Sequence, residues 1–407
     1  FSRDLTRLGD AKARKSRSRR VQLSVGASMK DFLHQRCEEV LREREEARLT
    51  RITCAWENDG DILNLADNDY LALASHPEVK AAAQEAIGRF GCSASSAPLV
   101  TGFRPPHEDL VNRIAAWYSV SADQVILWNS GYAANRALLG LLPQKGDYVF
   151  ADRLVHQSML AGILASGARF SRYRHLDLVE LEGLLRKNIT GRPMFVATET
   201  VFGMDGDCPD LDFLANLREK YGFVLILDEA HALGWYGPKG AGLAEHAGVL
   251  EHVDVLVGTL GKALGSQGAF TIFRNTFVKR LVENFAAEYV YSTFLAPANA
   301  AAASKAVEIA ESLECDRPIW RASASALRQE LEIQGLQTIM GDSPVVPILV
   351  GEADLAMRAA ENLVRDRLKV VAIRPPTVPV GAARLRMSYK AGLSTDGLSE
   401  RLAGAIN

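Results

Sequence analysis

Apolar and polar positions alternate along most of this chain in the pattern of a parallel α/β sheet. Between residues 68 and 273, short apolar runs rich in β-branched residues are separated by amphipathic stretches with helical spacing. Such runs are typical of strands buried on both faces, and the stretches between them of crossover helices. The predicted helices are Pro77–Arg89, Glu108–Tyr118, Tyr132–Leu142, Ser158–Ala165, Leu176–Lys187 and Leu211–Lys220. The predicted strands of this mostly parallel sheet are Gln124–Trp128, Asp147–Phe150, Met194–Thr198, Phe223–Leu227, Val253–Val257 and Gly268–Phe273.

The two ends of the chain follow other patterns. Residues 30–49 predict one charged helix, because their apolar residues recur at helical spacing. The other elements expected near the ends are a strand at Ile62–Leu65, helices at Ala300–Ser312 and Ile319–Gln334, and strands near Val345–Val350 and Arg384–Ser388. We therefore expect three parts: a basic N-terminal extension with a helix over residues 1–60, a large α/β domain over 61–296, and a smaller α+β domain over 297–407.

The charge of the chain changes this picture only at its beginning. The 407 residues include 47 Lys and Arg and 49 Asp and Glu, a net charge of −2, which excludes a globally basic nucleic-acid binder. Residues 1–30 hold nine basic and two acidic side chains, a balance of +7, so the remainder carries −9. A solvated tail is the favoured interpretation, and binding to nucleic acid or a membrane surface is the alternative. Because the tail lacks interleaved aromatic residues, no nucleic-acid partner is expected.

The composition of the chain also bears on its cellular location. No apolar run reaches the roughly 18–20 residues that span a bilayer, so no membrane span is expected, and no apolar stretch follows the basic opening as in a secretory signal. The five cysteines are scattered and form no CxxC or His/Cys cluster. We therefore expect reduced thiols, no bound metal and a cytoplasmic location.

Candidate chemistry lies where the predicted strands end, because ligands of parallel sheets bind beyond the carboxyl ends of the strands. In FVLILDEAHALG the apolar run ends at Asp228, and His231 follows three residues later. Such a carboxylate can pair with a protonated ring nitrogen of a cofactor. The alternative is an aspartate that caps a helix beside a locally packed histidine.

A lysine follows another predicted strand. Lys262 lies in GTLGKALG, after the strand Val253–Val257 and among several glycines. Partial burial lowers the pKa of a lysine and makes it able to form a Schiff base. A surface lysine with a buried stem is the alternative.

Two further strand ends carry weaker signals. Ser130, Gly131 and Tyr132 lie at a strand-to-helix junction, where free N–H groups favour a phosphate. His156 lies between a strand and a helix, where an imidazole can stack on a flat ring or act only structurally. Neither GxGxxG nor GxxxxGK[ST] occurs, which removes the common nucleotide-binding motifs. An anion site, a Schiff-base lysine, a carboxylate and an imidazole along one sheet together fit pyridoxal 5′-phosphate.

The motifs that contain these residues resemble those of a known family. NDYLALASHP, SGYAAN, FGMDGD, DEAHALG, GTLGKALG, YSTFLAP and IRPPTVPVGAARLRMS occur in the order of the α-oxoamine synthases. These are pyridoxal-phosphate enzymes of fold type I. The resemblance implies a large domain with a mostly parallel central sheet and a smaller α+β C-terminal domain. It runs from about residue 49 to the C-terminus.

The resemblance also implies roles for residues around the cofactor ring. Lys262 would carry the cofactor and shuttle a proton, Asp228 would pair with the pyridinium nitrogen, and His231 would bond the phenolic oxygen. His156 would stack on the ring and assist catalysis. Gly203 replaces the serine usual at this cofactor-contacting position. We therefore expect one altered cofactor contact and a wider acyl side of the pocket.

Other residues would hold the phosphate and the substrates. The residues expected at the phosphate are Ser130, Gly131, Tyr132, Ala133 and Thr259. Ser292 and Thr293 would reach the phosphate of the partner subunit, so the resemblance implies a homodimer with shared active sites. Asn68 and Arg386 would lie at the amino-acid substrate, with Arg386 binding its carboxylate by a two-pronged contact. Arg51 is the candidate for an arginine on the CoA side.

The activity implied is a decarboxylative condensation of an amino acid with an acyl-CoA. The leading expectation is 8-amino-7-oxononanoate synthesis from L-alanine and pimeloyl-CoA, in biotin synthesis, because the C-terminal motif is most similar to that group. NDYLAL and GPKGAGL also resemble the synthases of long-chain α-hydroxyketone autoinducers. The alternatives are therefore an aminoketone synthase for signalling or secondary metabolism, an enzyme similar to 2-amino-3-ketobutyrate CoA ligase, and a plain aminotransferase.

Overall fold

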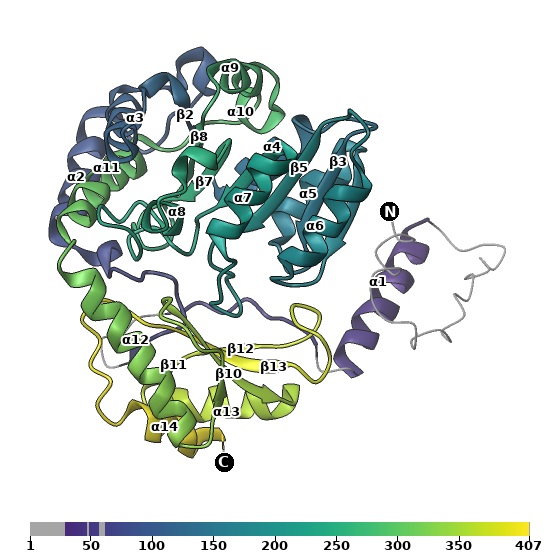
Figure 1. Ribbon diagram of the computed structural model, residues 1–407. Helices are drawn as coiled ribbons and strands as arrows, with labels where there is room; N and C mark the ends of the chain where they lie inside the picture. Colours follow the sequence, from purple (N-terminus) through teal and green to yellow (C-terminus); the bar gives the residue numbers. More distant parts are fainter. Residues whose placement is uncertain (1–28, 47–48, 57–61, 407) are drawn as a thin grey trace. The chain divides into compact units, whose positions relative to one another are not determined.

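The computed structural model of the protein describes residues 29–46, 49–56 and 62–406 (Figure 1). The chain divides into two units, Phe1–Trp56 and Glu57–Asn407. In the first unit α1 (Met29–Glu46) confirms the helix predicted over residues 30–49, with an earlier end. The expectations for the basic tail, residues 1–28, lie outside the described residues.

The second unit is built on a seven-stranded sheet with the strand order β2-β8-β7-β6-β5-β3-β4. The strands are β2 (Val125–Trp128), β3 (Tyr148–Asp152), β4 (Arg169–Tyr173), β5 (Met194–Glu199), β6 (Val224–Asp228), β7 (Val255–Thr259) and β8 (Ala269–Phe273). β2, β3, β5, β7 and β8 are buried along their whole length. Burial on both faces explains why these segments are continuously apolar. The six predicted strands are confirmed to within two residues.

Two features of this sheet go beyond the prediction. The sheet is mostly parallel, as expected, but β8 runs antiparallel to both of its neighbours, β7 and β2. Only residues 260–268 join β7 to β8, and a parallel connection needs a dozen residues or more, so the chain turns directly back. The edge strand β4 is not among the predicted strands, because its sequence RFSRY is polar and mostly half-exposed.

Helices connect the strands and pack against the sheet. Those of the first half are α2 (Pro77–Phe90), α3 (Pro105–Tyr118), α4 (Gly131–Leu141), α5 (Gln157–Ser166), α6 (Leu178–Lys187), α7 (Leu211–Tyr221), α8 (Leu243–His246), α9 (Thr276–Phe285) and α10 (Ala287–Val290). α3 packs against β2, α4 against β7 and β8, and α6 against β4. Side chains of Ser130, Asp177 and Asp210 cap α4, α6 and α7 by accepting an N–H of the first turn. Among the described residues, no helix is long and apolar enough to cross a membrane.

The C-terminal region forms a second sheet with the strand order β12-β13-β10-β9. Its elements are α11 (Pro297–Ser312), α12 (Asp316–Ile333), β9 (Gln337–Thr338), β10 (Val345–Gly351), α13 (Ala353–Arg365), β12 (Val371–Ile373), β13 (Ala383–Ser388) and α14 (Leu398–Ile406). α13 packs against β10, β12 and β13, whereas α11 packs against α2 and α3 of the first half. A domain boundary at residue 297 stays a prediction, since Glu57–Asn407 forms one unit.

The segment before α2 pairs with the C-terminal region. β1 (Leu63–Asn64) pairs in parallel with β11 (Leu368–Lys369). The N–H of Ser388 then donates to the carbonyl of Leu65 at 2.8 Å, and the N–H of Ala391 donates to that of Tyr70 at 2.7 Å. These bonds lay residues 65–70 beside the end of β13.

Candidate active site

Polar residues gather where the parallel strands end. β5 ends at Glu199, β6 at Asp228 and β7 at Thr259, and Glu199 lies opposite Asp228 in the strand register. All three are buried, with 6%, 5% and 9% of their surface exposed. Uncompensated burial of carboxyl groups is costly, so two of them side by side mark a site with a chemical use.

Asp228 is held rigidly by neutral donors. Its Oδ2 accepts a hydrogen bond from Asn135 Nδ2 at 2.6 Å, and its Oδ1 accepts one from the N–H of Ala230 at 2.8 Å. Asn135 also donates to Ser158 Oγ, which lies 2.7 Å from Nδ1 of His156. The helix-cap alternative for Asp228 is wrong, since the next helix, α8, begins only at residue 243. One network therefore fixes both the carboxylate and the imidazole.

Lys262 lies on the connection between β7 and β8, and its Nζ is 2.7 Å from Nε2 of His231. Burial lowers the pKa of Lys262 from 10.5 to about 8, although Asp228 and Glu199 favour the charged form. A lysine with this pKa is partly neutral near physiological pH, which makes its nitrogen a nucleophile. Its contact with the buried His231 excludes the surface-lysine alternative.

His231 links the lysine to a tyrosine. Its Nδ1 is 2.7 Å from Oη of Tyr70, a residue with no exposed surface. Burial, reinforced by the charges of Lys262 and Arg386, lowers the pKa of His231 well below its usual range, so the imidazole is neutral. A charged Lys262 can only donate, so Nε2 accepts, and Nδ1 carries the proton and donates to Tyr70.

Arg386 brings a buried positive charge into the site from β13. Its Nε donates to the carbonyl of Gly203 at 2.6 Å, and its Nη2 donates to Asn68 Oδ1 at 2.8 Å and to Tyr70 Oη at 3.2 Å. Arg386 is 4% exposed and forms no ion pair with a carboxylate of the described residues. Its Nη1 makes no hydrogen bond there either. This guanidinium is suited to bind the carboxylate of a small substrate.

The candidate phosphate site predicted from the sequence lies at the start of α4. The first N–H groups of a helix have no partner within it, and here Ser130 Oγ accepts only the N–H of Ala133. A Cβ built at Gly131 would lie 3.9 Å from Oγ1 of Thr259, so β7 ends beside the start of this helix. Tyr132, the next residue, is 47% exposed and meets the ring of His156 edge-on. The predicted phosphate ligands therefore lie together.

Ser292 and Thr293 adjoin this helix start in the same chain. Asn129 Nδ2 donates to Ser292 Oγ at 3.0 Å and to the carbonyl of Thr293 at 2.7 Å, while the buried Oδ1 of Asn129 has no hydrogen-bond partner among the described residues. That Ser292 and Thr293 serve the partner's phosphate stays a prediction. The role of Arg51 also stays a prediction, because Arg51 belongs to the first unit.

Gly203 corrects one expectation. A wider pocket was expected here because the family's serine side chain is missing. A Cβ built at Gly203 would lie only 2.4 Å from Nε2 of His231 and 3.0 Å from two carbons of the ring. The imidazole of His231 therefore fills the space beside Gly203, and the expected widening at this point is wrong. Gly203 contributes through its backbone, by binding Arg386.

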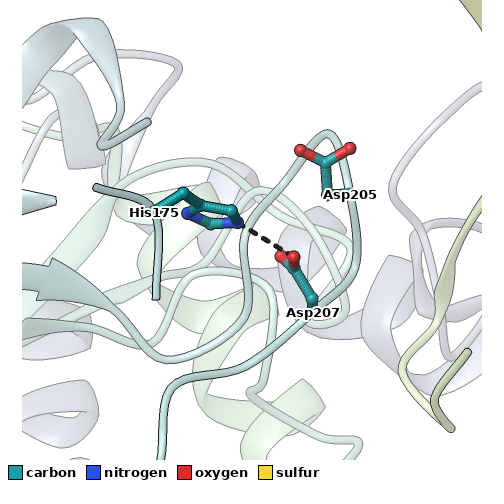
Figure 2. A group of neighbouring side chains, drawn as sticks. All are labelled: His175, Asp205 and Asp207. Atoms are coloured by element: carbon teal, nitrogen blue, oxygen red, sulfur yellow. Dashed lines mark hydrogen bonds and ion pairs between the residues drawn. The ribbon is translucent and has the colours of Figure 1, made fainter. Parts of the chain in front are cut away.

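A charged cluster lies just beyond Gly203. Figure 2 shows His175 pointing at Asp207, with Asp205 on the same loop as Asp207. Nε2 of His175 is 2.9 Å from Asp207 Oδ2, its Nδ1 is 2.9 Å from Asp152 Oδ1, and Asp205 pairs with Arg384 of β13. Burial alone would lower the pKa of His175, but the two aspartates outweigh it and raise the pKa to about 9. The ring is therefore protonated at neutral pH and donates to both aspartates.

The sequence prediction missed several residues of this site, among them Tyr70, Asn135 and Glu199. Glu199 follows the predicted strand Met194–Thr198 directly, so the rule that located Asp228 applies to it equally. Asn135 lies one helical turn after Gly131 within SGYAAN, a spacing that returns it to the same face of α4. Tyr70 has no local signal, because its partners come from β13 and from the loop after β6.

Comparison with known proteins agrees with this geometry. The aminotransferase class I and II family matches residues 60–406. An 8-amino-7-oxononanoate synthase of Pelobacter propionicus is 39% identical over 92% of this chain and 96% of its own length. The chain belongs to the α-oxoamine synthase family. Two solved structures are also similar, a serine palmitoyltransferase from S. paucimobilis with bound PLP-myriocin aldimine and an 8-amino-7-oxononanoate synthase from Francisella tularensis. The first has a TM-score of 0.85 at 24% identity, covering 92% of this chain and 98% of its own. The second has a TM-score of 0.73 at 26% identity, covering 86% of this chain and 97% of its own.

The residues present fit pyridoxal 5′-phosphate, the cofactor of this α-oxoamine synthase. A ring with a basic nitrogen needs a fixed carboxylate, an aldehyde needs a partly neutral lysine, and a phosphate needs free N–H donors. Asp228, Lys262 and the start of α4 supply these three groups within one site.

Proposed function

We propose that this α-oxoamine synthase condenses L-alanine with pimeloyl-CoA and releases CoA and CO₂, the reaction of 8-amino-7-oxononanoate synthesis in the biotin pathway. The reaction type is supported mainly by the buried Arg386, which has no carboxylate partner among the described residues. Arg386 is linked through Tyr70 and His231 to Lys262. The choice of substrates is supported by relatives of that name at 39% to 42% identity.

Each residue of the site has a defined task in this reaction. Pyridoxal 5′-phosphate supplies a ring that withdraws electrons from the α-carbon of the bound amino acid. Asp228 keeps the ring nitrogen protonated, since a buried carboxylate stabilises a neighbouring positive charge. Nη1 of Arg386 holds the substrate carboxylate, and Lys262, as a neutral amine, removes and returns the α-proton. His231 accepts a hydrogen bond from the lysine whenever the lysine is charged.

We propose further that the protein acts as a homodimer. Phe277, Leu281 and Phe285 are 76%, 42% and 68% exposed and lie at intervals of four on α9, so one face of this helix is apolar and open to solvent. Tyr291, 85% exposed, follows shortly after, directly before Ser292. Contiguous exposed apolar groups mark contact surfaces, and this one adjoins the residues predicted to serve the partner's phosphate. Light scattering on the purified protein will give twice the chain mass, or the proposal fails.

The reaction is tested with purified protein supplied with pyridoxal 5′-phosphate. L-Alanine, glycine and L-serine are each combined with pimeloyl-, decanoyl- and palmitoyl-CoA, while CoA, CO₂ and product mass are measured. Turnover with L-alanine and pimeloyl-CoA is expected, and Lys262→Ala should abolish both turnover and the visible absorption of the bound cofactor. Turnover with decanoyl-CoA alone would identify an aminoketone synthase of another pathway. Amino-group transfer without release of CoA and CO₂ would identify an aminotransferase.

A cytoplasmic location follows from the proposed pathway and the expected reduced cysteines. All five cysteines, Cys37, Cys54, Cys92, Cys208 and Cys315, are free thiols in the structure. Free thiols persist in a reducing compartment.

A further inference from the structure

Glu199 is a buried acid that the reaction described above does not use. It ends β5 directly opposite Asp228 and is 6% exposed. Its Oε1 accepts the backbone N–H of His156 at 2.7 Å, and the backbone N–H of Gly203 is near enough to help lower the pKa of its carboxyl. One side chain therefore binds the loop after β3 and adjoins the loop after β5.

Both loops carry groups that face the substrate site. The first presents the imidazole of His156, whose Nδ1 joins the network through Ser158 to Asp228. The second presents the carbonyl of Gly203, which accepts Nε of Arg386 at 2.6 Å. Because Arg386 is fixed at its Nε by this carbonyl, the direction of its remaining Nη1 depends on where the loop lies.

We propose that Glu199 is a positioning residue of the active site, which ties the loops of His156 and Gly203 to the end of β5. Through them it orients the imidazole and the guanidinium. This inference rests on the proposed function, because it assigns the imidazole to the cofactor and the guanidinium to the amino-acid carboxylate. The bonds to Glu199 use backbone donors, so an acceptor oxygen at this place is required rather than a negative charge.

The state of the carboxyl agrees with such a role. Burial, followed by the neighbouring Asp228, raises the pKa of Glu199 to about 8, while Lys262 and the two N–H donors oppose the shift. Below this pH the site contains one carboxylate, Asp228, beside Lys262. The neutral amide of Glu199→Gln reproduces that charge and keeps the acceptor oxygen, whereas Glu199→Ala removes the acceptor.

Glu229 provides a matched control. It is also a fully buried glutamate just beyond a strand of this sheet, and its pKa is also raised, to about 7, mainly by burial. Its oxygens accept from Thr200 Oγ1 and from the N–H groups of Leu243 and Ala244 at the start of α8. Glu229 bonds neither His156 nor Gly203 and reaches the loop after β5 only at its first residue, Thr200, so Glu229→Ala reports the structural loss of a buried acid.

The experiment compares Glu199→Ala, Glu199→Gln, Glu199→Asp and Glu229→Ala with the wild type in three measurements. These are the melting temperature, the dissociation constant of pyridoxal 5′-phosphate from titration of the apoprotein, and the dissociation constant of the amino acid from the change in cofactor absorption without acyl-CoA. The amino acid is whichever of L-alanine, glycine or L-serine changes the wild-type spectrum. For Glu199→Ala we expect both dissociation constants to rise about tenfold, the effect of losing one or two buried hydrogen bonds. For Glu199→Gln both dissociation constants should stay within about twofold of the wild-type values. For Glu199→Asp they should lie between those of the other two variants, and this variant replaces Glu199→Ala in the comparison if the alanine variant does not fold.

The outcomes separate the alternatives. Glu229→Ala should lower the melting temperature but leave both dissociation constants within about twofold. If Glu199→Ala and Glu229→Ala behave alike, Glu199 is merely structural and the proposal is overturned. If Glu199→Gln raises both dissociation constants as much as Glu199→Ala does, the carboxyl group itself takes part in binding, and the proposal that Glu199 only positions the two loops is rejected. A wild-type protein that binds no pyridoxal 5′-phosphate would instead overturn the proposed function.

Discussion

Replacing His175 by glutamine should destabilise the protein in a way that depends on pH. The imidazole is 21% exposed and lies between Asp152 and Asp207, 2.9 Å from each. These aspartates raise its pKa from 6.5 to about 9 against the opposing effect of burial. A pKa raised on folding stabilises the folded protein below the unfolded value, and this contribution is lost as the pH rises through the folded value. It is therefore complete below about pH 6.5 and absent above about pH 9.

The size of the effect follows from the shift. At 1.36 kcal/mol per unit of pKa, the difference between 6.5 and about 9 corresponds to about 3 kcal/mol. The variant His175→Gln keeps a polar group but has no charge at any pH. We expect it to lose about 3 kcal/mol of unfolding free energy relative to the wild type at pH 6. At pH 10 only the smaller loss from altered packing and hydrogen bonding should remain.

The assay is urea unfolding followed by tryptophan fluorescence at pH 6 and pH 10, with wild type and variant compared at each pH. Titrating groups that do not contact His175 cancel in that comparison. His34→Gln, an exposed position on α1, is the control and should stay within about 0.5 kcal/mol at both pH values. An equal loss for His175→Gln at pH 6 and pH 10 would refute the ion-pair reasoning and leave only a packing role.

Three further predictions concern the active site. The rate at which apoprotein reacts with pyridoxal 5′-phosphate should rise with pH through an apparent pKa of about 8, since burial lowers the pKa of Lys262 to that value; a rate independent of pH between 6 and 9 would contradict this. Arg386→Lys should raise KM for the amino acid about tenfold or more while altering kcat less, because an ammonium cannot make the two-pronged contact; equal effects on both constants would count against carboxylate binding. Gly203→Ala places a carbon 2.4 Å from Nε2 of His231, so we expect the ring to move away from Lys262. The pH dependence of the reaction of apoprotein with pyridoxal 5′-phosphate, which reports the free amine of Lys262, should then be displaced, and an unchanged dependence would mean that the loop moves instead.

The sequence locates those parts of the site that belong to single strands and their loops. Asp228, Lys262, His156 and Ser130 each follow an apolar run, and the physics of buried parallel strands places the ends of such runs on one edge. Glu199 obeys the same rule and is a residue that the rule should also have found.

The rest depends on contacts between segments far apart in the chain. Tyr70 meets Arg386 only because residues 65–70 lie beside the end of β13, a pairing that leaves no periodic signal in either segment. The direction of β8 is set by the length of one connection rather than by its own composition. At Gly203 the sequence shows that a side chain is missing, but only the packing shows that the ring of His231 fills its place.

The short connection between β7 and β8 limits which insertions the sequence of this enzyme can accept. Lys262 lies within it, and the connection is closed on itself by bonds from Leu260 N–H to Gly268, from Ser266 N–H to Leu260 and from Gly265 N–H to Lys262. A Cβ at Gly265 would lie 2.2 Å from the backbone nitrogen of Ala74, so this turn is also pressed against the segment before α2. Lengthening it by even one residue would displace the reactive nitrogen from His231. Among related chains, insertions should accumulate in the surface loops and be absent from this one.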